Sequence, residues 1–153
     1  MKSRKRSAAN SRSIKPPDEQ FEFFVDECIA FHHVAAMLRE AGYSAHVPGP
    51  TTFRTGTQDV DWLPHVGERQ WILITKDKSI RKREIELRAL HEAHVRTFVL
   101  TAAGLKGDEQ ARVLKEALPA MLRLLRRRST HFIARITAES SVEIIEFHKY
   151  IRL

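Results

Sequence analysis

Hydrophobic positions follow two alternating patterns along the chain, one typical of strands and one typical of helices. Short apolar or alternating runs predict strands at residues 21–25, 43–47, 71–75 and 95–100. Apolar stripes with helical spacing predict helices at residues 29–42, 59–70, 78–94 and 108–128. Residues 131–150 break this rhythm, because two period-2 runs around "ESS" predict a β-hairpin. The alternation implies an α/β fold, with a mostly parallel sheet between two layers of helices and a C-terminal hairpin.

The first 19 residues differ in composition from the rest of the chain. They are basic and Ser-rich and are closed by Pro16-Pro17, which predicts a disordered tail before a single domain at residues 20–153. The basic start has no apolar core behind it, so we expect no secretory signal. No apolar run approaches the roughly 18 residues that span a bilayer, so no membrane partner is expected.

Two acidic residues, Asp26 and Glu27, follow the first predicted strand with no Gly, Pro or Asn between them and the strand. Asp is a favoured N-cap residue, so Asp26 can be a solvent-exposed helix cap. It can also be half of a metal site, because functional groups of open α/β sheets gather at the carboxyl ends of the strands. The acidic pair alone leaves both interpretations open.

Further acidic residues occur at two other points that the predicted sheet brings to the same edge. Asp77 follows the strand "WILIT" and Thr75, while Asp59 and Asp61 open the helix that leads into this strand. Taken singly, Asp59 is explained as an N-cap and Asp77 as a turn residue. Taken together, such carboxylates would repel one another and raise their own pKa values. A hard cation such as Mg²⁺ or Mn²⁺ relieves this repulsion, so the pattern favours a metal site.

Three segments of the chain then resemble a known family. "FFVDECIA", "TQDVDWL" and "WILITKDKSI", in that order and spacing, are similar to the PIN-like nucleases, in particular to their toxin-type branch of the VapC kind. In that family an Asp ends the first strand, an acidic residue opens the helix before the third strand, and Thr-x-Asp ends the third strand. The resemblance covers residues 21 to about 100 and implies the PIN-like version of the predicted α/β fold.

The resemblance also implies an activity, which is metal-dependent cleavage of RNA by an activated water. Asp26, Asp59 and Asp77 would be the catalytic and metal-binding acids, with Glu27 and Asp61 as supporting or alternative ligands of Mg²⁺ or Mn²⁺. The family further implies an RNA substrate and an antitoxin protein that occludes the site, as in type II toxin–antitoxin pairs. A second copy of the chain, in a homodimer, is the other partner that we consider.

Basic residues are the second feature of the predicted rim. The net charge of +7 suggests a polyanionic partner such as nucleic acid or an acidic protein. The cations that follow the third predicted strand are Lys76, Lys78, Arg81, Lys82 and Arg83. They are expected either to hold RNA phosphates or to form a solvated helix start. PIN domains often carry a fourth acid in this segment, where Lys78 stands instead, so the site is expected to bind one metal or to use Lys78 for a phosphate.

The remaining chemistry-bearing residues give weaker signals. His91 and His94 form H-x-x-H, but no third ligand follows nearby, so no zinc site is predicted. His32 and His33 are predicted to pack or to lie at the surface. Cys28 is the single cysteine, which excludes an intrachain disulfide and is typical of a reducing cytoplasm. It lacks the His and Asn context of a cysteine nucleophile, so we interpret it as a small buried residue.

Other functional classes share parts of the pattern. Toprim domains also use Asp-x-Asp, but there it ends a strand, whereas Asp59 and Asp61 are predicted to open a helix. Response-regulator receivers need a Lys after a later strand, and nothing after "VRTFVL" supplies it. The alternative kept open is a basic adaptor with a PIN-like fold that has no catalytic activity. Such an adaptor would bind nucleic acid or have a regulatory role. Divalent-metal binding through Asp26 and Asp77 distinguishes the nuclease from the adaptor.

Overall fold

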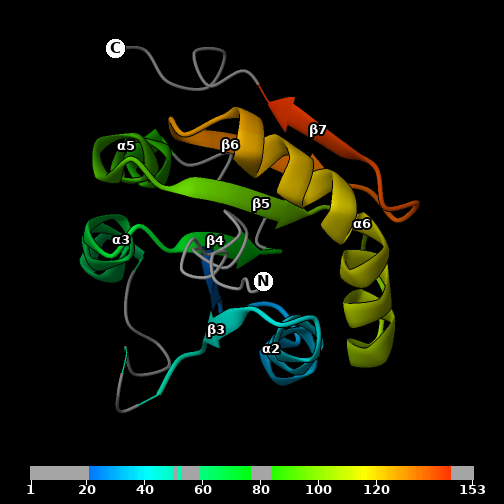
Figure 1. Cartoon of the computed structure of the whole chain (residues 1–153). Helices are drawn as coiled ribbons and strands as arrows, with labels where there is room; N and C mark the ends of the chain where they lie inside the picture. Colours follow the sequence, from blue (N-terminus) through cyan, green and yellow to red (C-terminus); the bar gives the residue numbers. More distant parts are fainter. Residues whose placement is uncertain (1–20, 50–51, 53–58, 77–83, 146–153) are drawn as a thin grey trace, which may run out of the picture.

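A layer of strands lies between two layers of helices in the computed structural model of the chain, which describes residues 21–49, 52, 59–76 and 84–145 (Figure 1). The side chains of residues 59, 60 and 84–87 lie outside this description. The strands are β2 (Glu22–Val25), β3 (Ser44–His46), β4 (Ile72–Thr75), β5 (Arg96–Leu100), β6 (Phe132–Ile136) and β7 (Val142–Ile145). The helices are α2 (Phe31–Glu40), α3 (Asp59–Glu68), α5 (Glu84–Ala93) and α6 (Gly107–Arg127).

The strands form one mixed sheet in the order β3-β2-β4-β5-β6-β7. The pairs from β3 through β6 are parallel, and only β7 runs antiparallel to its neighbour β6. β6 and β7 are the predicted C-terminal hairpin, with Ile136 opposite Val142. The predicted α/β architecture with its terminal hairpin is therefore confirmed.

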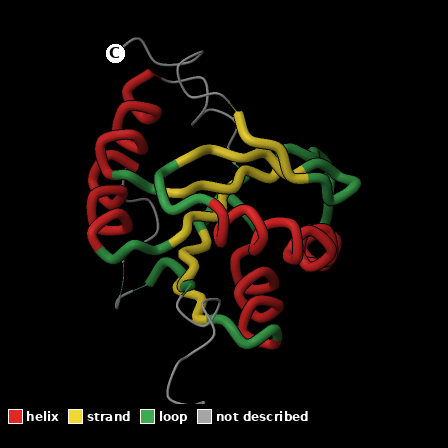
Figure 2. The backbone as a smooth tube through the Cα atoms, turned by 45° about the horizontal axis from the view of Figure 1, so that its top comes forward, coloured by secondary structure: helices red, strands yellow, loops and turns green. Residues whose placement is uncertain are grey.

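Each face of the sheet buries its own apolar cluster, as the side-chain period of 2 requires. Phe23 and Val25 point to the face covered by α2 and α6, whereas Phe24 points to the face covered by α3 and α5. Figures 1 and 2 show these helix pairs on opposite sides of the strands. The central strand β4 is buried along its whole length, which explains its continuous apolar run.

Helix α2 ends at Glu40, just before Gly42, the glycine that the sequence predicts to stop it. Gly42 has φ 97°, in the left-handed region that residues with a Cβ disfavour. Its N–H donates to the Arg39 carbonyl, and the Tyr43 N–H donates to the Leu38 carbonyl. This pair of hydrogen bonds is the Schellman arrangement, and it turns the chain from α2 directly into β3.

The strand order reverses direction once, between β2 and β4. The chain runs from β2 outward to β3 and then crosses back to pair β4 on the other side of β2. In doubly wound sheets, ligands bind at such a switch point, outside the carboxyl ends of the two strands. Asp26 and Lys76 directly follow those two ends. Among the described helices, none has the length and apolar character needed to cross a membrane.

Candidate active site at the carboxyl ends of β2 and β4

Asp26 is held at the switch point by the sheet itself. Its backbone N–H donates to the Ile74 carbonyl at 3.0 Å, which extends the pairing of β2 with β4 by one residue. The residue is only 6% exposed, in contrast to Glu27 that follows it, which is exposed. An acidic side chain that is buried at this position calls for a chemical explanation, because burial disfavours the charged form.

The helix-cap explanation of Asp26 is wrong. Helix α2 begins at Phe31, and its N-cap residue is Ala30, four positions after Asp26. The Ala30 N–H donates to the side-chain oxygen of Gln110 at 2.8 Å, so the first turn of α6 holds the backbone where α2 begins. Asp26 therefore belongs to a separate loop between strand and helix, and its side chain is not used to start α2.

Both carboxylate oxygens of Asp26 accept hydrogen bonds from neighbouring residues. Oδ1 accepts from the Glu27 backbone N–H at 2.7 Å. Oδ2 accepts from the Thr75 hydroxyl at 3.0 Å and from the Cys28 thiol at 3.3 Å. Thr75 is fully buried at the end of β4. These contacts fix the orientation of the carboxylate from two strands that are far apart in sequence.

The electrostatics of Asp26 are dominated by desolvation. Burial raises the pKa of Asp26 above its usual value, and the negative charge of Glu27 raises it further. The hydrogen bonds from Cys28, Thr75 and the Glu27 N–H lower this pKa and offset part of the burial effect. A carboxylate with a raised pKa at a ligand-binding edge is typical of a functional group. A cation beside it would stabilise the charged form.

Cys28, taken as a whole residue, is exposed to solvent, so the prediction that it is buried is wrong. Its sulfur nevertheless turns toward the site, where it lies 2.9 Å from the Thr75 hydroxyl oxygen and accepts from the Lys76 N–H at 3.4 Å. Desolvation of the thiol and the neighbouring Asp26 charge raise the pKa of Cys28 to about 12. The thiol is therefore protonated at neutral pH and acts as a donor to Asp26, not as a nucleophile.

The other predicted ligands are placed only in part. Asp61 is exposed near the start of α3, and this helix begins at Asp59. The Asp-x-Asp pattern therefore opens a helix, as the sequence predicts, whereas in Toprim domains it ends a strand. The side chain of Asp59 and the whole of Asp77 lie outside the described residues. Within the described part of the chain, no group of three or more His, Cys, Asp or Glu side chains could hold a metal ion. The convergence of the three acids thus stays a prediction.

The basic residues of the predicted rim are also placed only in part. Lys76 is half-buried directly after β4, and its backbone N–H contacts Cys28. The other four predicted phosphate-binding residues lie outside the described residues; they are Lys78, Arg81, Lys82 and Arg83.

The residues that are described fit a hard divalent cation. A carboxylate has about four lone-pair sites, and contacts to the described residues Glu27, Thr75 and Cys28 occupy three of them in Asp26. Oxygen is the ligand that Mg²⁺ and Mn²⁺ prefer. The carboxylate of Asp26 is therefore chemically suited to such an ion.

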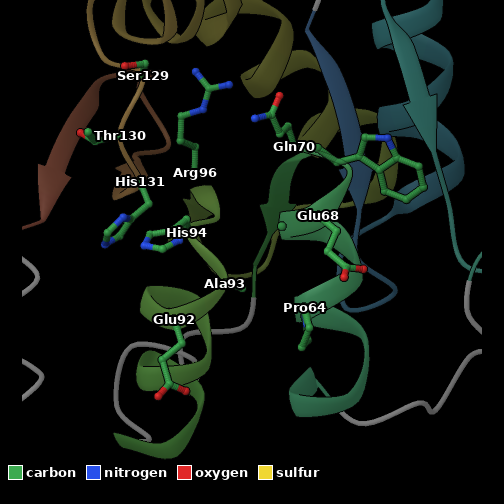
Figure 3. Close-up of a pocket in the computed structure, with 12 residues that line it drawn as sticks. Pro64, Glu68, Gln70, Glu92, Ala93, His94, Arg96, Ser129, Thr130 and His131 are labelled. Atoms are coloured by element: carbon green, nitrogen blue, oxygen red, sulfur yellow. The ribbon is translucent and has the colours of Figure 1, made fainter.

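A histidine cluster at the opposite edge of the sheet was missed by sequence reasoning. His131 Nε2 lies 2.9 Å from His91 Nδ1, and the rings of His94 and His131 lie 5.1 Å apart. His94 and His131 line a cavity of about 900 Å³ together with Arg96, between the ends of α3 and α5 (Figure 3). His131 is 40 residues from His91, so the H-x-x-H spacing gave no sign of it.

The cluster of His91, His94 and His131 is expected to make the folded protein less stable at acidic pH. Desolvation lowers the pKa of His131 below its ordinary value of 6.5, and the nearby His91, His94 and Arg128 lower it further. The folded state thus favours neutral His131, and this contribution is complete above about pH 6.5 and is lost as the pH falls through the lower folded pKa. The melting temperature of His131→Gln should therefore fall less between pH 7.5 and pH 5 than that of the wild type.

The matched control is His32→Gln, which changes an exposed histidine on α2. Its melting temperature should follow the wild-type pH profile. Parallel profiles for His131→Gln and the wild type would contradict the assignment of acid sensitivity to His131.

Comparisons with known proteins bear on residues in and around this site. A family model described as "PIN like domain" matches residues 21–102, which include β2, β4 and β5. Over 106 residues the chain is 27% identical to the protein named "Putative ribonuclease VapC45" of Mycobacterium tuberculosis (strain ATCC 25618 / H37Rv). This match covers 67% of the chain and 77% of that protein. No solved structure shows a significant match.

Proposed function

Because the chain belongs to the PIN-like domain family, we propose that it is a metal-dependent endoribonuclease and the toxin of a type II toxin–antitoxin pair. The similarity to a protein named as a ribonuclease of the VapC series supports the choice of RNA as substrate. The net charge of +7 supports a polyanionic substrate as well. The cytoplasm, where such a toxin meets cellular RNA, is the proposed location.

One observation carries the proposal. A buried carboxylate, Asp26, sits at the switch point of a doubly wound sheet and accepts a hydrogen bond from Thr75 at the end of the neighbouring strand. A carboxylate with only a structural role gains little from this position, because burial raises its pKa and opposes its charge. A carboxylate that binds a cation needs this orientation and this location.

In the proposed mechanism the chain holds the cation and orients the RNA strand. Asp26 would hold Mg²⁺ or Mn²⁺ together with Asp59 and Asp77, and Glu27 and Asp61 would be supporting ligands. When bound, such an ion supplies Lewis-acid stabilisation of the charge that develops on the phosphate and activates water for attack.

The residues around Asp26 preserve this arrangement. Thr75 and the Glu27 N–H hold the carboxylate in one orientation by direct hydrogen bonds. The thiol of Cys28 stays protonated and donates a further hydrogen bond to the carboxylate.

Basic residues next to β4 would position the RNA strand. Lys76 is half-buried beside the site, and the rest of the proposed phosphate contacts come from the segment that follows. They are Lys78, Arg81, Lys82 and Arg83. Phosphate contacts place a strand without reading its sequence, so this rim would hold any RNA across the carboxyl edge. An antitoxin protein that covers the edge would inhibit cleavage by blocking the RNA.

A cleavage assay with controlled metal content tests the proposal. The purified chain should cleave mixed cellular RNA in the presence of Mg²⁺ or Mn²⁺, and excess EDTA should abolish cleavage until the metal is restored. Gel electrophoresis of the RNA reports the result. RNA that is bound but stays intact with both metals would contradict the nuclease proposal and favour the basic adaptor.

A further inference from the structure

Gln110, in the first turn of α6, is one of the four polar side chains that are buried in the described part of the chain. Asp26 and Thr75 are two of the others, and they bind each other at the carboxyl edge. The fourth, Thr97, donates to a backbone carbonyl two residues earlier. Gln110 is only 5% exposed, and a buried amide costs free energy unless its polar atoms find partners. Its partners therefore show what this position is for.

The side-chain amide of Gln110 joins the two connections that follow β2 and β5. Its Oε1 accepts from the Ala30 N–H at 2.8 Å, at the end of the connection from β2 to α2. Its Nε2 donates to the Leu105 carbonyl at 3.0 Å, in the connection from β5 to α6. The first partner can only donate and the second can only accept, so these two groups fix the orientation of the amide. A hydrocarbon side chain of the same length would satisfy neither of them.

Close packing between α2 and α6 reinforces this contact at Gly107. A Cβ atom at Gly107 would lie 2.9 Å from the His33 ring and 3.3 Å from the Ala30 Cβ. A larger residue would therefore have to displace the His33 ring or the start of α2. The two helices lie on the same face of the sheet (Figure 1). The start of α2 is thus seated on the first turn of α6 by packing as well as by the Gln110 hydrogen bond.

Residues 26–30 form a short loop between β2 and α2 that is held at both ends. At the start, the Asp26 N–H donates to the Ile74 carbonyl of β4 at 3.0 Å. At the end, the Ala30 N–H donates to Gln110. Without the second hydrogen bond, the sheet would still hold the start of the loop, but the end of the loop would lose its contact with α6.

The middle of this loop supplies two of the hydrogen bonds that orient the Asp26 carboxylate. The Glu27 N–H donates to Oδ1 and the Cys28 thiol donates to Oδ2. Both residues are exposed, so the positions of their donors depend in part on the ends of the loop. The Thr75 hydroxyl, in contrast, donates from β4 and does not depend on the loop. Release of the loop at Ala30 would therefore loosen two donors and leave the third in place.

We propose that Gln110 is a positioning residue of the candidate active site, which holds the end of the 26–30 loop and so keeps two donors on the Asp26 carboxylate. The inference rests on the proposed function, because this orientation is the one in which Asp26 would hold a divalent cation. Residues that orient a metal ligand contribute about 10- to 100-fold to metal affinity or activity. Gln110 acts through the loop, so we expect the lower end of this range.

Gln110→Met tests the proposal in the full chain, because methionine fills a similar space and makes neither hydrogen bond. Mn²⁺ affinity, measured by calorimetry, should fall about tenfold, and RNA cleavage at limiting Mn²⁺ should fall with it. RNA binding in EDTA should stay at the wild-type level, since the amide is buried. Hydrogen exchange, followed by mass spectrometry, should become faster in residues 26–30.

Ser140→Ala is the matched control for the loss of a hydrogen bond to another element. The Ser140 hydroxyl donates to the Val113 carbonyl of α6 at 2.8 Å, from the connection between β6 and β7. Its removal should lower the melting temperature about as much as Gln110→Met does. Mn²⁺ affinity and exchange in residues 26–30 should stay at the wild-type level, because Ser140 does not contact this loop.

Gln110→Glu separates the hydrogen bonds from packing by means of pH. An ionised carboxylate still accepts from the Ala30 N–H but repels the Leu105 carbonyl, whereas the protonated form can donate to it as the amide does. Burial favours the protonated form. The loss of Mn²⁺ affinity relative to the wild type should therefore shrink as the pH is lowered from 7.5 to 6. The loss in Gln110→Met should not change with pH, because methionine does not titrate.

Two results would overturn the inference and leave the proposed function standing. Wild-type Mn²⁺ affinity in Gln110→Met would mean that Gln110 only stabilises the fold. Equal losses in Gln110→Met and Gln110→Glu at every pH would mean that the hydrogen bonds of the amide do not set the metal affinity. A wild-type chain that neither binds Mn²⁺ nor cleaves RNA would overturn the proposed function, and this inference with it.

Discussion

Replacement of Asp26 by Asn is expected to abolish RNA cleavage while the protein remains folded. Cleavage should fall at least about 100-fold, which corresponds to about 2.7 kcal/mol of lost transition-state stabilisation. Asn has the same shape but removes a buried charge whose pKa burial has raised. The metal-free variant should therefore melt at the same temperature as the wild type or a few degrees higher.

The assay combines RNA gels in Mn²⁺ with thermal unfolding in EDTA. Glu139→Gln, which changes an exposed acid in the β6–β7 turn, is the matched control and should leave both properties unchanged. Asp77→Asn should lose cleavage as Asp26→Asn does, since both acids are proposed ligands. Wild-type cleavage in Asp26→Asn with an unchanged metal requirement would exclude this carboxylate from the site.

The second large effect is expected at Thr75, which touches the carboxylate but is not a proposed ligand. Val has nearly the same shape and cannot donate, so Thr75→Val removes the 3.0 Å hydrogen bond to Asp26 Oδ2. Residues that orient a metal ligand typically contribute 10- to 100-fold to metal affinity or activity. We expect losses of about this size in Mn²⁺ affinity, measured by calorimetry, and in RNA cleavage.

Thr75→Ser separates orientation of the carboxylate from packing. Serine keeps the donor and loses one methyl group, so it should restore most of the metal affinity at some cost in stability. If Thr75→Val bound Mn²⁺ as tightly as the wild type, the hydrogen bond to Asp26 would have no part in holding the metal.

Local sequence patterns predicted the elements of the fold because each strand and helix has a regular period. The strand that contains Phe23, Phe24 and Val25 was predicted from its aromatic and β-branched residues, and the structure shows these side chains alternating between the two faces. The end of α2 just before Gly42 was also predictable, since the left-handed conformation of Gly42 is a local property. The start of α2 was not, because the backbone N–H of its N-cap residue, Ala30, is held by Gln110, 80 residues away.

The candidate site was predictable as far as its position in the fold. The acid after β2 and the Thr at the end of β4 were expected at one edge, and the structure places Asp26 and Thr75 in contact. Burial of Asp26 and exposure of Cys28 depend on how the intervening loop packs, so they were not predictable. The same applies to His131, which reaches His91 and His94 only through the pairing of β6 with β5.

The pairing of β2 with β4 also has a consequence for synthesis on the ribosome. Asp26 leaves the exit tunnel about fifty residues before Thr75, the residue that orients it. Parallel strands cannot pair until the whole crossover between them has been made. A nascent chain that ends before β4 therefore contains Asp26 but lacks Thr75, the residue on β4 that orients the Asp26 carboxylate. Products that terminate before β4 are therefore expected to lack the proposed cleavage activity.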